Sequence, residues 1–278
     1  MPYERELEII SDAVKRGGQL ALQMRPNISA ADITTKGGDP RDILTEVDPA
    51  VQKLIFDTLG PDFPGVTFIG EEGKTRQELE KLARAADKIV VDPIDGTTNF
   101  TRHTSFKWGT TACLIKENQP VAGAIFLPAI DVMITASRGG GCFINGQRQT
   151  ATGTMPLSQS VIGVEWYYLD ESRAQKQLAL ITTVRGSHAN LSAVYSIYEL
   201  VQGEIDAYLN IHIPERSACI WDFAAGHLFM REMVSSEAQH GVAFFPDGQP
   251  LSYENRIGME ALLTPYLELA EEVIVKMR

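Results

Sequence analysis

The first 60 residues carry two hydrophobic patterns with the period of an α-helix. Apolar residues recur at helical spacing from Leu7 to Met24, which predicts an amphipathic N-terminal helix. Pro26 then ends or kinks it. A second pattern, PAVQKLIFDTLG, has proline in its first turn and Gly60 near its end, so it predicts another helix. The glycine-rich, charged stretch TTKGGDPRDILTEVDPA between them predicts a loop or an irregular hairpin.

Shorter apolar runs predict strands. GVTFIG and KIVVDPID are rich in β-branched residues and are bounded by glycine, proline or charge. The segment KWGTTACLIKENQPVAGAIFLPAIDVMITASRGGGCFING predicts an antiparallel meander with turns at Glu-Asn, at Pro-Ala and at the glycine run. After about residue 150 strands alternate with helices, as in SVIGVEW, SRAQKQLALITTV and LSAVYSIYELVQG. We therefore predict an N-terminal lobe of residues 1–153 and a C-terminal lobe of residues 154–278.

Composition excludes several classes of protein. Lys and Arg number 25 against 36 Asp and Glu, and the resulting net charge of −11 disfavours nucleic acid and anionic membranes as partners. No apolar run approaches the roughly 20 residues of a membrane span. The start of the chain lacks the apolar core of a signal peptide. The three cysteines lack any CxxC pairing, so they argue against a disulfide framework or a zinc site and fit a reducing cytoplasm.

The stretch VVDPIDGTTNF places two carboxylates, Asp92 and Asp95, directly after an apolar run. Like charges in one site raise each other's pKa and cost free energy unless a cation neutralises them. Asp-Pro-x-Asp-Gly is also the composition of a tight turn, in which both side chains would point into water. Either the pair is splayed into solvent or a cation lies between its members.

Further carboxylates favour the cation. Glu71 and Glu72 end the strand-like run FIG, and Asp222 begins the apolar helical pattern of WDFAAG, although a solvated turn and a helix cap are the simpler readings of these two features. Carboxylates are the ligands that Mg²⁺, Mn²⁺ and Ca²⁺ prefer, and the Asp-Pro-x-Asp segment has no histidine or cysteine for zinc. A site with so few carboxylates suits Mg²⁺ better than Ca²⁺. Mg²⁺ completes its coordination shell with water and substrate, whereas Ca²⁺ is often enclosed by protein ligands alone.

The Gly96-Thr97-Thr98 segment that follows adds an anion site. Glycine lets the backbone approach a ligand closely, and threonine is a good cap for a helix that starts at TTNF. Backbone N–H groups at a helix start bind anions. A hard-metal site beside an anion cradle is typical of a phosphate-ester hydrolase.

The three motifs GEE, DPIDGTTNF and WDFAAG, in this order and at these separations, resemble the inositol monophosphatase superfamily. ITTKGGDPRDILTEVD is similar to the family's lysine-bearing loop, and ASRGGGCFINGQR resembles its glycine-rich strand turn. The likeness covers nearly the whole chain. It implies a layered α-β-α-β-α sandwich, in which a smaller C-terminal α/β lobe closes over a site on an N-terminal α+β lobe.

The resemblance also implies a lithium-sensitive, magnesium-dependent phosphatase that forms a homodimer and binds two to three Mg²⁺ ions per site. Carried over, the first ion is held by Glu71, Asp92 and the main-chain carbonyl of Ile94. The second is held by Asp92, Asp95 and Asp222. Asp92 then bridges two cations, which explains how two aspartates tolerate each other three residues apart.

The remaining roles follow from the same resemblance. Glu72 faces a third, weaker magnesium or its waters, and Lys36 neutralises charge near it, unless Lys36 is a solvated loop lysine. Glu71 and the Thr97 hydroxyl, with Asp48 behind it, orient and deprotonate the attacking water. Asp95, Gly96 and Thr97 form the phosphate-binding segment. No side-chain nucleophile is needed, so we expect no covalent phosphoenzyme.

The part of the site that recognises the leaving alcohol departs from the family pattern. Ser192 and Ala193 in NLSAV match the family's small-Thr-Ala segment, and Glu215 lies seven residues before Asp222 as the family's glutamate does. The run from Asp-Ala-Tyr to Trp-Asp is longer than usual, however. Asn210 and His212 therefore compete with Glu215 as substrate-binding candidates, and a lone histidine is more often structural.

We expect hydrolysis of a small phosphorylated metabolite, first an inositol monophosphate, with fructose 1,6-bisphosphate or histidinol phosphate as further candidates. An alternative is a nucleotide phosphatase acting on adenosine 3',5'-bisphosphate or NADP, because Trp166, Tyr167 and Tyr168 offer aromatic platforms in the second lobe. A third hypothesis is a non-catalytic metal-binding regulator, which the complete ligand set disfavours.

Overall fold

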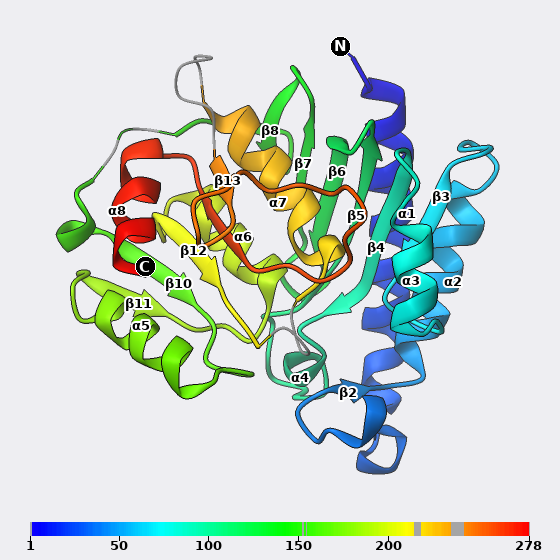
Figure 1. Ribbon diagram of the computed structural model, residues 1–278. Helices are drawn as coiled ribbons and strands as arrows, with labels where there is room; N and C mark the ends of the chain where they lie inside the picture. The colour runs from blue at the N-terminus through cyan, green and yellow to red at the C-terminus, as the bar shows by residue number, and fades with distance from the viewer. Residues whose placement is uncertain (1, 152, 154, 214–217, 235–241, 278) are drawn as a thin grey trace.

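The computed structural model describes residues 2–151, 153, 155–213, 218–234 and 242–277. In this part of the chain the two larger β-sheets, of seven and five strands, alternate with three layers of helices (Figure 1). No helix in the described ranges is long and apolar enough to cross a membrane. The predicted α-β-α-β-α sandwich is confirmed.

The larger sheet has seven strands in the order β3-β4-β5-β6-β7-β8-β9. Strands β3 and β4 run parallel, and every later neighbour is antiparallel. The predicted meander is confirmed, and its Glu-Asn turn places both Glu117 and Asn118 at positive φ. The strands are β3 (Thr67–Gly70), β4 (Lys88–Asp95), β5 (Gly109–Lys116), β6 (Gln119–Leu127), β7 (Val132–Ser137), β8 (Gly141–Ile144) and β9 (Gln147–Gln149).

The smaller sheet has five strands in the order β11-β10-β12-β14-β13. The first three run parallel, as the predicted alternation of strands and helices requires, and β14 then pairs antiparallel with both β12 and β13. The strands are β10 (Val161–Val164), β11 (Gly186–His188), β12 (Ala207–Asn210), β13 (Val242–Phe244) and β14 (Ala261–Thr264).

Three helix layers cover the sheets (Figure 1). α1 (Glu4–Met24) and α2 (Val47–Leu59) pack on the outer face of the larger sheet, and α5 (Glu171–Ile181) and α8 (Leu267–Met277) pack on the outer face of the smaller one. α6 (Ala193–Gln202) and α7 (Ile220–Met233) lie between the sheets. α7 is buried on nearly all sides because it touches both sheets, so its sequence is apolar all round.

Several local features differ from the prediction or refine it. α2 begins at Val47, two residues before Pro49, and a helix α3 (Arg76–Leu82), capped by Thr75, was not predicted. The charged loop forms a minimal antiparallel hairpin of β1 (Thr34–Thr35) and β2 (Ile43–Leu44). The lobe boundary near residue 153 stays a prediction.

Candidate metal-dependent active site

A bulge in β4 brings Asp92 and Asp95 to one side of the sheet. Residues three apart on a regular strand point to opposite faces. Here Asp92 pairs with Thr111 and Asp95 with Gly109, so β4 uses one more residue than β5 between these pairs. The extra residue in Pro93-Ile94 turns both carboxylates toward the same site. Because of this bulge, the two aspartate side chains point toward one site, and the alternative of a pair splayed into solvent does not hold.

Asp222 completes a cluster of three carboxylates from distant parts of the chain. It lies in the first turn of α7, two residues inside the start at Ile220, and accepts a hydrogen bond from the Cys219 N–H at 2.6 Å. The prediction that the helix begins at Asp222 is therefore wrong by two residues, and the structure brings Asp222 next to Asp92 and Asp95. Carboxylate oxygens of Asp92, Asp95 and Asp222 all lie within 4.8 Å of one another.

The crowding of these charges is visible in their pKa values. Burial raises the pKa of Asp92 well above its ordinary value, and the charges of Glu71, Asp95 and Asp222 raise it further. Burial raises the pKa of Asp222 too, and the charges of Asp95 and Glu71 raise it further. For Asp95 burial raises the pKa to about 6, although hydrogen bonds from Ser192 and the following backbone oppose it. Such a cluster of hard oxygen donors fits a divalent cation.

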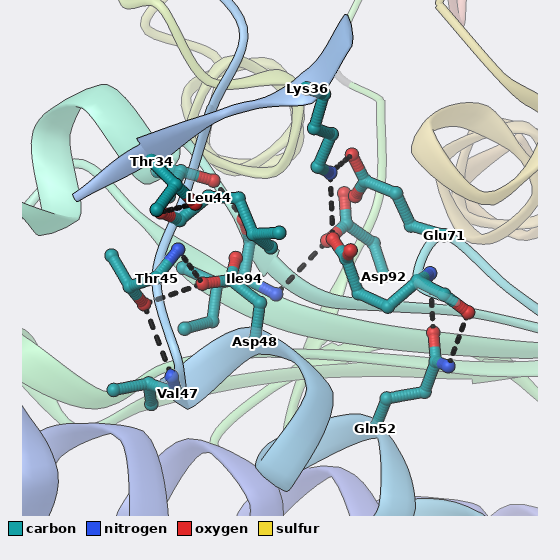
Figure 2. Close-up of polar contacts among 12 residues, drawn as sticks. Thr34, Lys36, Leu44, Thr45, Val47, Asp48, Gln52, Glu71, Asp92 and Ile94 are labelled. Carbon is teal, nitrogen blue, oxygen red and sulfur yellow. Dashed lines mark hydrogen bonds and ion pairs between the residues drawn. The ribbon is translucent and has the colours of Figure 1, made fainter. Parts of the chain in front are cut away.

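Glu71 and Glu72 directly follow β3, and both form ion pairs with the Lys36 side chain. Figure 2 shows Glu71 and Lys36 beside Asp92. The Lys36 ammonium lies 2.6 Å from a carboxylate oxygen of each. Burial would lower the Lys36 pKa, but the two glutamates raise it above its ordinary value, so the lysine is charged. For Glu72, burial and the Glu71 charge raise the pKa to about 7. The alternative of Lys36 as a solvated loop residue does not hold.

Gln52 on α2 fixes the backbone that carries these glutamates. Its side-chain amide donates to the Glu72 carbonyl at 3.0 Å, and its side-chain oxygen accepts from the Glu72 N–H at 2.9 Å (Figure 2). A Cβ on Gly70 would clash with the same amide at 2.1 Å, so glycine is needed before the paired glutamates. Sequence reasoning missed Gln52. Its position in the sequence could have indicated a role, because Gln52 lies four residues after Asp48. This spacing places two buried polar side chains on one face of α2.

Asp48 and Thr97 lie near the site with partners of their own. Asp48 accepts from the Thr45 N–H at 3.0 Å and from its hydroxyl at 2.6 Å, and burial raises its pKa to about 6. The Thr97 hydroxyl donates to the Ile94 carbonyl at 3.0 Å. Among the described residues no hydrogen bond joins Thr97 to Asp48, so their joint action on a water stays a prediction. Thr97 and Ile94 both line the cavity described below.

The phosphate-binding segment is a short helix, α4 (Thr97–Phe100), whose N-cap is Gly96 rather than a threonine. Gly96 has φ +81°, and a Cβ there would come within 2.9 Å of the Lys107 carbonyl. The C-terminal end of α4 is held by buried Arg25. Its guanidinium donates to the carbonyls of Phe100 at 2.8 Å and Arg102 at 2.7 Å. Arg25 thus satisfies the carbonyl end of α4 and fixes the loop that follows.

The start of α6 supports Asp95. The Ser192 hydroxyl donates to its carboxylate, and the N–H groups of Ala193 and Val194 donate at 3.2 and 3.0 Å. The predicted substrate residue Ser192 therefore holds a metal-site carboxylate. Leu191, just before it, has φ +55°, and its N–H donates to the buried Glu165 carboxylate at 3.1 Å.

The carboxylates line a cavity of about 520 Å³, bounded by residues at the ends of β3, β4 and β12 and at the starts of α4, α6 and α7. Ala193, Asn210 and His212 line it on the side of the smaller sheet, and Arg41 and Tyr168 line it near the β1–β2 hairpin. Glu215 lies outside the described residues. Arg41 and Glu165 were missed, because neither has a local sequence signal that shows which distant segment it contacts.

The comparisons with known proteins agree with this geometry. The model of the inositol monophosphatase family matches residues 3–275. The chain belongs to this family. An inositol-1-monophosphatase of Rhizobium meliloti is 30% identical over 251 residues, which is 88% of each chain. The Nus factor SuhB of Escherichia coli is 28% identical over 230 residues, 81% of this chain and 82% of that protein.

A solved IMPase structure from Thermotoga maritima has the same fold. It superposes with a TM-score of 0.78 at 20% identity, over 99% of this chain and 100% of that one. The family is metal-dependent, and the cluster of Asp92, Asp95 and Asp222 in this chain fits a metal site. The relatives include both phosphatases and a Nus factor, so the cluster itself must carry the functional argument.

Proposed function

We propose that this protein is a magnesium-dependent phosphatase that hydrolyses a small phosphate monoester with water as the nucleophile. The convergence of Asp92, Asp95 and Asp222 carries the proposal, because their oxygens lie within 4.8 Å of one another and a divalent cation would offset the repulsion that raises the pKa of Asp92. Glu71, Asp92 and the Ile94 carbonyl would hold one Mg²⁺, and Asp92, Asp95 and Asp222 a second. Mn²⁺ or Ca²⁺ could occupy the same oxygen ligands.

When bound, Mg²⁺ would neutralise the phosphate dianion, lower the pKa of the attacking water and stabilise the leaving alkoxide. The chain's own groups then have defined tasks. The backbone amides of Gly96 and Thr97 hold phosphoryl oxygens, next to Asp95. Glu71 accepts a proton from the water, and Thr97 and Asp48 orient it. The P–O bond to the alcohol breaks as the water oxygen bonds to phosphorus, and the alcohol leaves with a proton from solvent.

Glu72 and Lys36 adjust charge at the edge of this arrangement. The Lys36 ammonium spans both glutamates, which partly neutralises the site. Glu72 would face a third, weaker Mg²⁺ or its waters, and Lys36 would neutralise charge beside it. The enzyme acts as a cytoplasmic homodimer in this proposal.

The test is phosphate release across a panel of esters with Mg²⁺ and with EDTA. Inositol 1-phosphate, fructose 1,6-bisphosphate, histidinol phosphate, adenosine 3',5'-bisphosphate and NADP cover the candidate alcohols. Mg²⁺-dependent release from at least one ester supports the proposal. If no ester releases phosphate while Mg²⁺ still binds, the non-catalytic reading, in which the fold serves as a regulator as the SuhB relative's name suggests for that protein, replaces it.

Lithium provides a second test of the same site. Millimolar Li⁺ should inhibit turnover at least tenfold, because a monovalent ion among Asp92, Asp95 and Asp222 cannot supply the charge of Mg²⁺. Matched assays in NaCl and KCl control for ionic strength. Full activity in LiCl would contradict the assignment of Asp95 and Asp222 to a shared ion.

A further inference from the structure

A second hollow lies beside the active-site cavity and is lined mainly by basic side chains. It has a volume of about 710 Å³ and is formed by α3 and the loop of residues 254–258, which precedes β14. In Figure 1 this loop extends past α7 toward α3. Arg76, Arg84 and Arg256 line the hollow, and Glu80 is the single acidic residue in the described part of its lining.

This local excess of positive charge contrasts with the rest of the chain, which has 25 Lys and Arg against 36 Asp and Glu. Glu80 lies 3.4 Å from Arg76 Nε, but both side chains are about half exposed, so the pair contributes little. Within the described ranges no ion pair joins Arg84 or Arg256 to a carboxylate. Two of the three guanidiniums are therefore left without a counter-charge from these residues.

The loop that carries Arg256 is fixed in place. The Arg256 guanidinium lies 4.3 Å from the ring centroid of Phe245. Asn255 makes the turn before it at φ +51°, and Ile257 after it is buried. The Ile257 carbonyl accepts a hydrogen bond from the Ile220 N–H at 2.9 Å, which ties the loop to the start of α7. A guanidinium held on a ring in this way loses little freedom when it binds a ligand.

The other two arginines come from α3. Arg76 is its first residue, and Arg84 follows its C-cap, Ala83. Arginines from two separate elements thus line one hollow, and the planar guanidinium binds phosphate oxygens through two parallel hydrogen bonds. The volume lies within the range of small-molecule sites and exceeds the size of a single phosphate ion. Three arginines on a chain of net charge −11 are too few for a nucleic acid.

The hollow is separate from the active-site cavity but adjoins it. Arg76 lines both, whereas no other described residue lining the hollow also lines the active-site cavity. Gly258 forms an antiparallel bridge with Cys219, three residues before Asp222. The second site therefore lies next to the first without using any of the proposed metal ligands.

We propose that this hollow binds a phosphorylated small molecule, whose phosphate or diphosphate group is held by Arg84 and Arg256, with Arg76 on the side of the active site. The inference goes beyond the proposed function, because it does not depend on whether the protein hydrolyses esters. It assigns a second ligand site to the outer surface of α3.

The experiment is isothermal titration calorimetry of the full chain with methylenediphosphonate, whose bridging carbon prevents hydrolysis. EDTA is present throughout, so that no metal draws the probe to the active-site carboxylates. Low salt is used, because exposed charges are screened at high ionic strength. We expect one site with a Kd below about 1 mM. Malonate, a dicarboxylate of similar shape, should bind more weakly, since it carries less charge and fewer acceptor oxygens than the diphosphonate.

Arg84→Gln and Arg256→Gln should each raise the Kd about tenfold, as expected for a lost charge-assisted contact. Arg41→Gln is the matched control: it removes the same charge from an exposed arginine that lines only the active-site cavity. Circular dichroism shows that all the variants are folded. Absence of binding to the wild type, an equal loss in Arg41→Gln, or malonate binding as tightly as the diphosphonate would overturn the inference. None of these results bears on phosphate release.

Discussion

Asp92 is buried and receives the repulsion of three other carboxylates. Its sequence neighbourhood predicted either a solvated turn or a cation, because paired aspartates after an apolar run repel each other unless water or a cation relieves the repulsion. The bulge that turns Asp92 and Asp95 to the same side could not be predicted, since it appears only in the pairing of β4 with β5. The residue types of a site can thus be predicted from a short stretch of sequence. The direction in which their side chains point depends on strand register, which that stretch does not show.

Asp92→Asn separates function from stability. It should lower kcat by more than about 100-fold, since even residues that only orient metal ligands cost 10- to 100-fold. In EDTA at pH 8 the Tm of the variant should equal or exceed that of the wild type, because a buried like-charge repulsion is removed. Calorimetry and phosphate release check both effects, with Asp57→Asn on the exposed face of α2 as the control. A large fall in Tm without metal would show that Asp92 is structural.

At the scale of secondary-structure elements, the N-terminus of α6 shows what a sequence cannot reveal. The helix itself was predicted from LSAVYSIYELVQG. Its role was not, because Asp95 and Ser192 are 97 residues apart and only the packing of α6 beside β4 joins them. The connection depends on Leu191, a non-glycine residue at φ +55°, which Glu165 holds by one hydrogen bond. Such backbone strain persists only where its surroundings fix it.

Glu165→Ala should therefore weaken activation by Mg²⁺ and lower kcat by about tenfold, a cost typical of lost support behind a metal ligand. Glu165→Gln keeps an acceptor for the Leu191 N–H and should keep most of the activity. Adding Leu191→Gly to Glu165→Ala should restore activity, because glycine adopts positive φ without help. Mg²⁺ titrations of kcat compare the four proteins. If glycine gives no rescue, Glu165 supports the fold in another way.

On the scale of the whole molecule, buried ionisable groups make stability depend on pH. Burial raises the pKa of Asp48 and Asp95 to about 6 and that of Glu72 and Glu165 to about 7. The unfolded chain releases these protons near pH 4. Stability from these groups is thus present at low pH and is lost as the pH rises through about 7. Burial lowers the pKa of His227 to about 3. The stability contributed by this neutral histidine is present above about pH 6.5 and is lost as the pH falls toward 3.

The buried carboxylates with raised pKa values outnumber the buried histidines with lowered ones, so their effect on stability dominates. The metal-free protein should therefore have a higher Tm at pH 5.5 than at pH 8. Mg²⁺ should raise the Tm more at pH 8 than at pH 5.5, because the ions bind the ionised carboxylates. Differential scanning calorimetry in EDTA and in Mg²⁺ measures all four values. A metal-free Tm that increases steadily from pH 5.5 to 8 would mean that the acidic cluster does not control the titration.

The helices and strands were predictable from local patterns, and the layered sandwich from the family resemblance that three short motifs carry. The same motifs named the three aspartates whose carboxylate oxygens lie within 4.8 Å of one another. The alcohol side of the cavity was not predictable. Its wall joins segments after β10 and β12 with the loop of the β1–β2 hairpin, and nothing in the sequence of Arg41 indicates that it lies over Tyr168. Long-range packing therefore determines this part of the cavity lining.

The most direct test of the central claim is a Mg²⁺ titration of phosphate release by the wild type and by Asp95→Asn, with calorimetry to show that both are folded. We expect no release in EDTA, saturable activation of the wild type by Mg²⁺, and at least a 100-fold lower rate for the folded variant at every Mg²⁺ concentration. Release that persists in EDTA, or equal rates for the two proteins, would contradict a catalytic site built on metal-binding carboxylates.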